Sequence, residues 1–210
     1  MLKLGPNSVP VLARGTQYIF CQNLEDVAEF VGLAGSGQTP LAPEILIRKW
    51  ITVLTAASRY VRQIPTERLH ERAIETRDRS VRLLSHHIFR IGEAFLEVAI
   101  DGVEYWAQLA NVSPEDGTYL TGSDIAAYGD GIIRRLERWW EALPDKSCRQ
   151  KVKAFYCDQP AHQLLERSTW HSTQHTRQMI AVLERMGVDP DGRLTAEDYA
   201  GLPLPEALWD

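Results

Sequence analysis

The sequence has few cysteines and no long apolar segment. Cys21, Cys148 and Cys157 are widely separated within the 210 residues and form no C-x-x-C pair. This pattern excludes a disulfide scaffold and gives no support to a redox centre or a thiolate zinc site. No apolar run reaches the roughly 18 to 20 residues of a membrane-spanning helix, and the first residues show no secretory leader. We therefore expect a cytoplasmic protein without a membrane partner.

An excess of basic residues is also missing. The 23 Lys and Arg residues are outnumbered by 28 Asp and Glu residues, so the formal net charge is -5. A surface that neutralises a phosphate backbone needs the opposite balance, and we expect no nucleic-acid partner. Hydrophobic residues make up 44% of the chain, which is enough for one core of ordinary size with a small appendage.

The amino-terminal segment has the pattern of a β-hairpin followed by a helix. Runs of β-branched and aromatic residues at 9–13 and 18–21 flank the turn-forming residues 14–17. A short helix should follow, with Asn23 as its N-cap and Gly32 at its end.

Four amphipathic stripes come next, each with the 3.6-residue period of a helix. Pro65 and Pro144 lie just beyond the first and third stripes, Ser123 is the expected cap of the third, and Gly187 follows the fourth. The residues on the stripes are, in chain order, Leu46, Trp50, Val53, Ala57, Tyr60 and Ile64; Val81, Leu84, Ile88, Ile91, Phe95 and Val98; Ile125, Tyr128, Ile132, Leu136, Trp139 and Leu143; and Leu164, Ser168, His171, His175, Met179, Val182 and Met186.

These patterns predict a mainly α protein, built as an antiparallel four-helix bundle with a small amino-terminal hairpin and helix. We expect the amino-terminal unit to span residues 1–33, a linker rich in Gly, Ser and Pro to span 34–43, and the bundle to span 44–187. The tail over residues 188–210 should pack on the bundle. Its apolar residues for this packing are Leu194, Tyr199, Leu202 and Trp209.

Two histidines occupy positions on the fourth stripe that its period reserves for apolar side chains. His171 and His175 are four residues apart, so one helix turn stacks their rings on the same face. The H-x-x-x-H spacing lets two imidazoles reach one metal ion at about 2.0 to 2.1 Å. The same spacing also occurs in structural and surface histidines, so the pair alone leaves both interpretations open.

The second stripe offers a third imidazole. With about 100° per residue, His87 lies roughly 70° from the mean direction of that stripe and His86 roughly 170° from it. We therefore expect His87 to border the core and His86 to face outward among charged residues. Together with the H-x-x-x-H pair, His87 would complete a neutral tris-histidine site with open coordination positions.

The segments LLSHHIFRIGEAFLE and STWHSTQHTRQM resemble the two histidine motifs of the DinB/YfiT-like superfamily of four-helix bundles. In that superfamily one histidine of the second helix and an H-x-x-x-H pair of the last long helix hold a metal. The resemblance covers about residues 43 to 187 and implies His87, His171 and His175 as ligands. Family members include bacillithiol transferases, mycothiol-dependent maleylpyruvate isomerases and uncharacterised proteins assigned as hydrolases.

A second resemblance covers the segment SVPVLARGTQYIFCQNLEDVAEFVGL, which is similar to the carboxy-terminal half of a glutaredoxin. In that family the residue before the proline binds the glutathione backbone, and this implies a glutathione contact at Val9. The half that would carry the redox cysteines is absent, so we expect no redox activity. Two strands and a helix are too small for a core of their own, and the unit should pack on the bundle or on a second subunit.

Five further residues are candidates for the surroundings of the metal. Arg90 would clamp an anionic substrate, since guanidinium matches carboxylate geometry, and Trp170 would wall the pocket beside a ligand. His86, Glu93 and Glu166 would hydrogen-bond the ligands or act as acids and bases. For each of the five, the alternative is an ordinary role in packing or on a solvated helix face.

The leading functional hypothesis is a metal-dependent enzyme acting on a small molecule. Zinc fits three neutral imidazoles best, with nickel, iron or manganese as alternatives. By resemblance, the reaction is thiol transfer or thiol-dependent isomerisation, with glutathione as the co-substrate if Val9 keeps that contact. A metal-dependent hydrolase is the first alternative, and a non-catalytic metal-binding or interaction bundle is the second. We also expect a homodimer.

Overall fold

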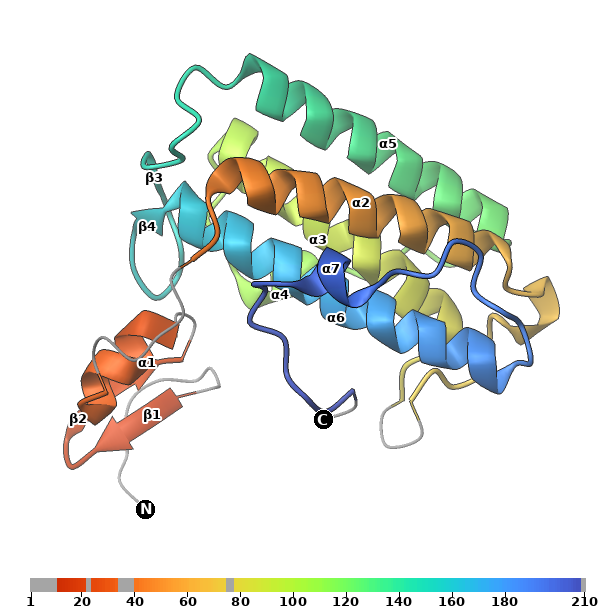
Figure 1. Ribbon diagram of the computed structural model, residues 1–210, viewed down its shortest axis with the longest axis horizontal. Coiled ribbons are helices and arrows are strands. Elements are labelled where there is room, and N and C mark those ends of the chain that lie inside the picture. The colour runs from red at the N-terminus through yellow and green to blue at the C-terminus, as the bar shows by residue number, and fades with distance from the viewer. Residues whose placement is uncertain (1–10, 22–23, 34–39, 75–77, 209–210) are drawn as a thin grey trace. The chain divides into compact units, whose positions relative to one another are not determined.

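A computed structural model describes residues 11–21, 24–33, 40–74 and 78–208 of the chain. The chain is mainly helical, with a small antiparallel sheet near its start (Figure 1). It divides into two compact units, Met1–Pro40 and Leu41–Asp210. The division falls within the segment that the sequence predicts as a linker.

The first unit contains the predicted hairpin and helix. Strands β1 (Val11–Arg14) and β2 (Gln17–Phe20) pair antiparallel, and α1 (Leu24–Val31) follows. The turn needs Gly15, because its φ of +64° is a conformation that L side chains rarely adopt. None of the side chains described in this unit is fully buried. Val9 and Asn23, the expected glutathione contact and N-cap, lie outside the described residues.

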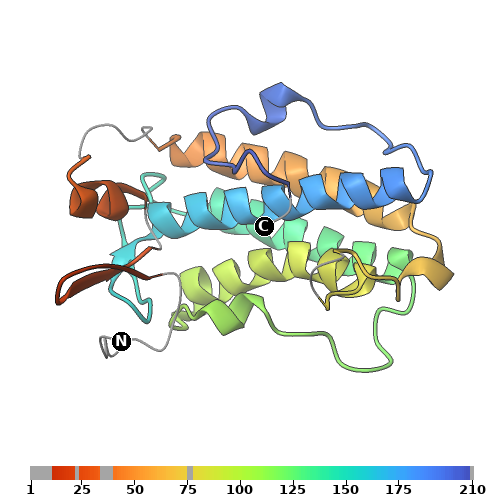
Figure 2. The same cartoon turned by 90° about the horizontal axis from the view of Figure 1, so that it is seen from below.

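Four long helices form the second unit: α2 (Pro43–Arg62), α3 (Val81–Asp101), α5 (Gly122–Ala142) and α6 (Ala161–Arg185). Helices α2 and α3 each pack against both α5 and α6, as Figures 1 and 2 show. Their apolar stripes face one another, and this confirms the predicted helices. The largest fully buried side chains of this core are Trp50, Tyr60, Phe89, Phe95, Leu46, Leu54, Leu69, Leu84, Ile88, Leu96, Ile125 and Leu136.

The ends of the long helices follow local chemistry. Gly102 and Gly187 follow α3 and α6 with φ of +69° and +76°, the left-handed conformation that commonly ends a helix. The prediction that Ser123 caps α5 is wrong. Thr121 is the cap, because its hydroxyl accepts a hydrogen bond from the Asp124 backbone while the Asp124 carboxylate accepts one from the Thr121 backbone.

Short elements connect the long helices, and the sequence analysis did not predict them. They are the 3-10 helix η1 (Thr66–Arg68), α4 (Ala107–Ala110), and the strand pair β3 (Lys151–Val152) and β4 (Gln159–Pro160). The tail then carries α7 (Ala196–Tyr199). Of these elements, α4 matters most for function, because its last carbonyl contacts a histidine of α3.

The tail packs along the outer faces of α2 and α6 (Figure 2). The Tyr60 hydroxyl donates a hydrogen bond to the Gly192 carbonyl at 3.2 Å and accepts one from the Leu194 backbone at 3.0 Å. Leu194 and Leu202 are buried, and Tyr199 is partly buried against the core. These three residues thus pack against the core, whereas Trp209 lies outside the described residues.

None of the helices in the described part of the chain is both long enough and apolar enough to cross a membrane.

Candidate metal centre

Three histidines meet where α3 packs against α6. His87 comes from α3, and His171 and His175 come from successive turns of α6. One ring nitrogen of each lies within 4.8 Å of one nitrogen of the other two. The ring centroids are 4.8 Å apart for His87 and His175, 4.9 Å for His171 and His175, and 5.2 Å for His87 and His171. The structure therefore brings together the three residues that the sequence predicts as ligands.

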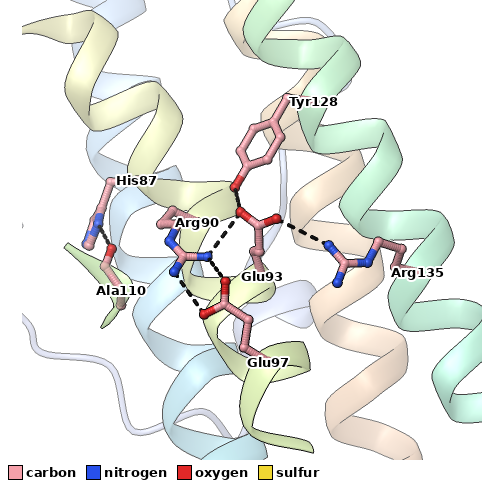
Figure 3. Close-up of polar contacts among 7 residues, drawn as sticks. All are labelled: His87, Arg90, Glu93, Glu97, Ala110, Tyr128 and Arg135. Atoms are coloured by element: carbon pink, nitrogen blue, oxygen red, sulfur yellow. Dashed lines mark hydrogen bonds and ion pairs between the residues drawn. The ribbon is translucent and has the colours of Figure 1, made fainter. Parts of the chain in front are cut away.

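Hydrogen bonds fix the orientation of two of these rings. Nδ1 of His87 donates to the carbonyl oxygen of Ala110 at 2.8 Å, because a carbonyl can only accept (Figure 3). Nδ1 of His175 donates to Oε1 of Gln178 at 2.7 Å. A neutral imidazole with its proton on Nδ1 carries its lone pair on Nε2. Such a partner on the second ring nitrogen is typical of histidines that bind metals.

Burial keeps two of the three imidazoles, those of His87 and His171, uncharged. Desolvation lowers the pKa of His87 to about 2, with further contributions from the neighbouring His175 and from the positive charge of Arg79. The pKa of His171 also falls well below its usual value, chiefly through desolvation and then through the other two histidines. Both rings are therefore neutral at pH 7, which is the protonation state that a metal ligand needs.

The donor set fits a divalent metal ion. In a tetrahedral zinc site, nitrogen ligands at about 2.0 to 2.1 Å from the ion lie about 3.4 Å from one another. One ring nitrogen from each of the three histidines lies within 4.8 Å of the others, a spacing compatible with a single ion held by all three. Three neutral nitrogens also suit other first-row metals, so the donor set does not choose the metal.

A small polar cavity adjoins His87, one of the three histidines. Its volume is about 60 Å³, which is room for a few water molecules or one polar group of a ligand. The cavity is lined by Arg79, Leu83, His86, His87, Asn111, Val112, Ser113 and Pro114. One wall is thus the segment after α4, and this segment is held by Arg82, which donates to the carbonyls of Glu115, Thr118 and Tyr119.

The prediction that His86 faces outward is wrong. Its side chain is 6% exposed and stacks on Tyr128 of α5, with ring centroids 5.1 Å apart and an interplanar angle of 8°. The ring centroid of Tyr119 also lies close to His86, 5.4 Å from the centroid of the imidazole. The prediction assumed one buried face for α3, but α3 packs against both α5 and α6 and so has two. Burial lowers the pKa of His86 to about 4.

Arg90 belongs to a buried ion cluster and not to a substrate clamp. Its guanidinium donates two hydrogen bonds to Glu97, at 2.7 and 2.9 Å, and lies 3.0 Å from Glu93. Glu93 in turn accepts hydrogen bonds from Tyr128 and Arg135 of α5. Figure 3 shows Glu93 pointing toward α5, whereas His87 points toward Ala110. Glu93 therefore joins α3 to α5, and Arg90 pairs with Glu93 and Glu97 within α3.

Trp170 and Glu166, the remaining candidates, both lie on α6, the helix that carries His171 and His175. Trp170 is half-buried, with its ring centroid 5.7 Å from that of His171. Arg167 lies over the Trp170 ring at 6.0 Å. Glu166 is half-buried, and burial raises the pKa of its carboxyl. The structure gives Glu166 no hydrogen bond to the three histidines among the contacts of the described residues.

Sequence reasoning missed three contributors to the site. Gln178 follows His175 by three residues, so helical spacing alone could have marked it as a partner of that ring. The Ala110 carbonyl and the Arg79 charge come from loops and short elements, whose positions depend on tertiary packing. No periodic pattern in the sequence points to either.

Comparison of the chain with protein-family models, with curated proteins and with solved structures gives no match. The geometry of the site and the two histidine motifs are therefore the grounds for a proposed function.

Proposed function

We propose that this protein is a metal-dependent enzyme of the DinB-like type, in which His87, His171 and His175 hold a divalent ion. The observation that carries the proposal is the convergence of three imidazoles with two of them held in the tautomer that leaves Nε2 as the ligand atom. The packing of α2 and α3 against both α5 and α6 supports a four-helix bundle of the kind that the two sequence motifs suggest.

The chemistry of the donor set favours an anionic reactant. A divalent ion bound to three neutral imidazoles keeps its full charge, and such an ion lowers the pKa of a bound thiol or water and polarises a carbonyl group. Arg79 adds positive charge beside His87 and His171. These residues together stabilise a thiolate or a hydroxide more than a neutral group.

The cavity beside His87 indicates a site for a substrate as well as for an ion. A structural zinc site is closed by four protein ligands, whereas the cluster contains three among the residues that the structure describes, and one of these, His87, lines a polar cavity. Asn111 and Ser113 on the cavity wall offer side chains that hydrogen-bond to polar substrate groups. This arrangement favours catalysis over a purely structural metal site.

Thiol transfer or thiol-dependent isomerisation is the proposed reaction, with zinc as the metal and glutathione as the first thiol to test. Its support is the resemblance of the two histidine motifs together with a site that stabilises thiolates. Hydrolysis is the alternative, because the same site stabilises hydroxide equally well. The choice between the two therefore depends on which nucleophile the cavity admits.

A direct test compares the two reactions on zinc-loaded protein. We expect glutathione to raise the melting temperature, by an amount that grows with the logarithm of its concentration above the dissociation constant, and to be consumed with an electrophilic acceptor. A His171→Gln variant should lose the activity, and a variant at exposed His70 should keep it. Hydrolysis of esters or lactones without a glutathione-dependent shift would instead favour the hydrolase. The absence of both activities in protein with a full complement of metal would contradict the enzyme proposal.

A further inference from the structure

The last described residues of the chain are tied to the helix that carries two of the metal ligands. Gln174 of α6 donates hydrogen bonds to the carbonyls of Ala207 and Leu208, at 3.3 and 2.9 Å. Arg177 donates to the carbonyl of Pro205 at 3.0 Å and to Oε1 of Gln174 at 2.8 Å. We call residues 205–208 the tail strap. Its backbone, and not its side chains, supplies the acceptors.

Gln178 contacts the strap and a metal ligand at the same time. Its Nε2 donates to the Leu208 carbonyl at 2.9 Å, and its Oε1 accepts from Nδ1 of His175 at 2.7 Å. The side chain is 6% exposed, so water has little access to replace either partner. A chain of two hydrogen bonds therefore runs from the backbone of the strap to the imidazole of His175.

The order of donors along this chain has one consistent direction. A backbone carbonyl can only accept, so the amide group must turn its NH₂ toward Leu208. The amide oxygen then faces His175, and His175 must place its proton on Nδ1. With the amide reversed, its NH₂ would face Nδ1, which would become the acceptor, and the proton would move to Nε2. An Nε2 that carries a proton cannot bind a metal ion.

We propose that the tail strap, acting through Gln178, sets the tautomer of His175 and so keeps this ligand ready for the metal. Gln178 is a positioning residue, since it lies behind the imidazole and not among the three ligands. The Leu208 carbonyl selects the orientation of the amide, and Gln174 holds that carbonyl in place. The inference rests on the proposed metal site, but the tautomer itself is a property of the protein without metal.

The direct test is the tautomer of His175 in metal-free protein, observed by the ¹⁵N shifts of the two ring nitrogens. We expect the Nδ1–H form to dominate in the native chain. Gln178→Leu should give a mixture of tautomers, because leucine offers no acceptor. Gln178→Glu should restore the Nδ1–H form, because both carboxylate oxygens accept and no orientation needs to be selected.

Removal of residues 205–210 distinguishes the contribution of the tail strap from that of Gln178. In the native background we expect a mixture of tautomers and a loss of zinc affinity of about 10- to 100-fold, the usual effect of removing a hydrogen-bond partner of a ligand. In the Gln178→Glu background the same truncation should change neither, because the carboxylate orients His175 without the strap. This double-mutant cycle measures the coupling of strap and glutamine.

If the shortened chain does not fold, Gln174→Leu serves as a full-length substitute that loosens the Leu208 carbonyl. It should weaken the tautomer preference in the native background and leave it intact beside Gln178→Glu. Equal effects of either change in both backgrounds, or a native His175 in the Nε2–H form, would overturn the proposal. A preserved tautomer pattern in a protein that binds no zinc would instead contradict the proposed function alone.

Discussion

At the scale of single residues, the site depends on histidines that the fold holds neutral. His86 and His87 are each 6% exposed, and burial lowers their pKa values to about 4 and about 2. An unfolded histidine has a pKa near 6.5. The unfolded chain therefore binds protons that the native chain does not bind at pH values below about 6.5.

This difference predicts that the metal-free protein loses stability in mild acid. The free energy of unfolding should fall as the pH drops below about 6.5, by up to about 1.4 kcal/mol per pH unit for each of the two histidines. The slope continues toward pH 4 for His86 and toward pH 2 for His87. Urea denaturation between pH 7.5 and pH 5.5 measures this effect before most carboxylates titrate.

Two variants identify the source of the slope. His87→Gln should give a shallower dependence on pH than the native chain, whereas His70→Gln, at an exposed position, should not change it. A free energy of unfolding that stays constant over this pH range, or an unchanged slope in His87→Gln, would show that these imidazoles are accessible to protons in the native state.

At the scale of the elements, the position of α3 against α5 is set by close packing and by charge. A Cβ added at Gly129 of α5 would lie 2.4 Å from the ring of buried Phe89, so this glycine allows the two helices to approach. A Cβ added at Gly131, two residues later, would have the flexible end of the Arg134 side chain as its nearest neighbour, 4.0 Å away. A side chain at position 129 would therefore collide with a neighbouring helix, whereas a side chain at position 131 has room.

We predict opposite effects of alanine at these two positions. Gly129→Ala should destabilise the protein by about 1 to 3 kcal/mol, because the methyl group overpacks against Phe89. Gly131→Ala should stabilise it by up to about 1 kcal/mol, because alanine favours the helix and meets no obstacle. Chemical denaturation of the pair provides a matched comparison. A stabilised Gly129→Ala protein would show that α3 and α5 are less closely packed.

The buried ion cluster gives a second prediction for α3. The Arg90 side chain is 7% exposed, and Glu97→Gln would remove half of its bidentate partner and the compensating charge. We expect a loss of about 1 to 3 kcal/mol in the free energy of unfolding, reduced by the partial exposure of Glu97. Asp130→Asn breaks the more exposed pair with Arg62 and should cost less than about 1 kcal/mol. Equal losses in the two variants would contradict the buried character of the cluster.

The sequence predicts the elements better than their surroundings. Periodicity identifies the four long helices and places His171 and His175 on one face of their helix and His87 at the border of the core, because each of these depends on spacing within one helix. The meeting of the two helices at the histidines was implied by the resemblance of the motifs. The burial of His86 depends on which helices pack against α3, and no spacing within α3 reveals a second packed face. The sequence does contain a signal for the Thr121 cap, since Asp124 follows Thr121 by three residues. It contains no signal for the contact of the Ala110 carbonyl with His87 or for the tail strap.

At the scale of the whole molecule, every residue of the candidate site lies in one of the two compact units. The three histidines, the Ala110 carbonyl, Gln178 and the strap all belong to Leu41–Asp210. The first unit contributes none of the described contacts of the site. Along the chain, the described residues of the metal centre are therefore separate from the segment that resembles a glutaredoxin.

This separation predicts that residues 41–210 fold and bind zinc without the first unit. The helical circular dichroism signal and the zinc dissociation constant of this fragment should match those of the full chain. A thermal shift with glutathione that disappears in the fragment while zinc binding persists would assign glutathione recognition to residues 1–40. A fragment that folds but does not bind zinc would show that the first unit contributes to the metal site.

The central claim is that His87, His171 and His175 hold one metal ion together. The most direct measurement is the zinc content and dissociation constant of the native chain and of single Gln variants at these positions, by competition with a chelator. We expect one tightly bound zinc per chain and a loss of tight binding in each of the three variants. His70→Gln and His86→Gln should bind zinc as tightly as the native chain. Zinc bound as tightly by all three variants, or not at all by the reconstituted native chain, would contradict it.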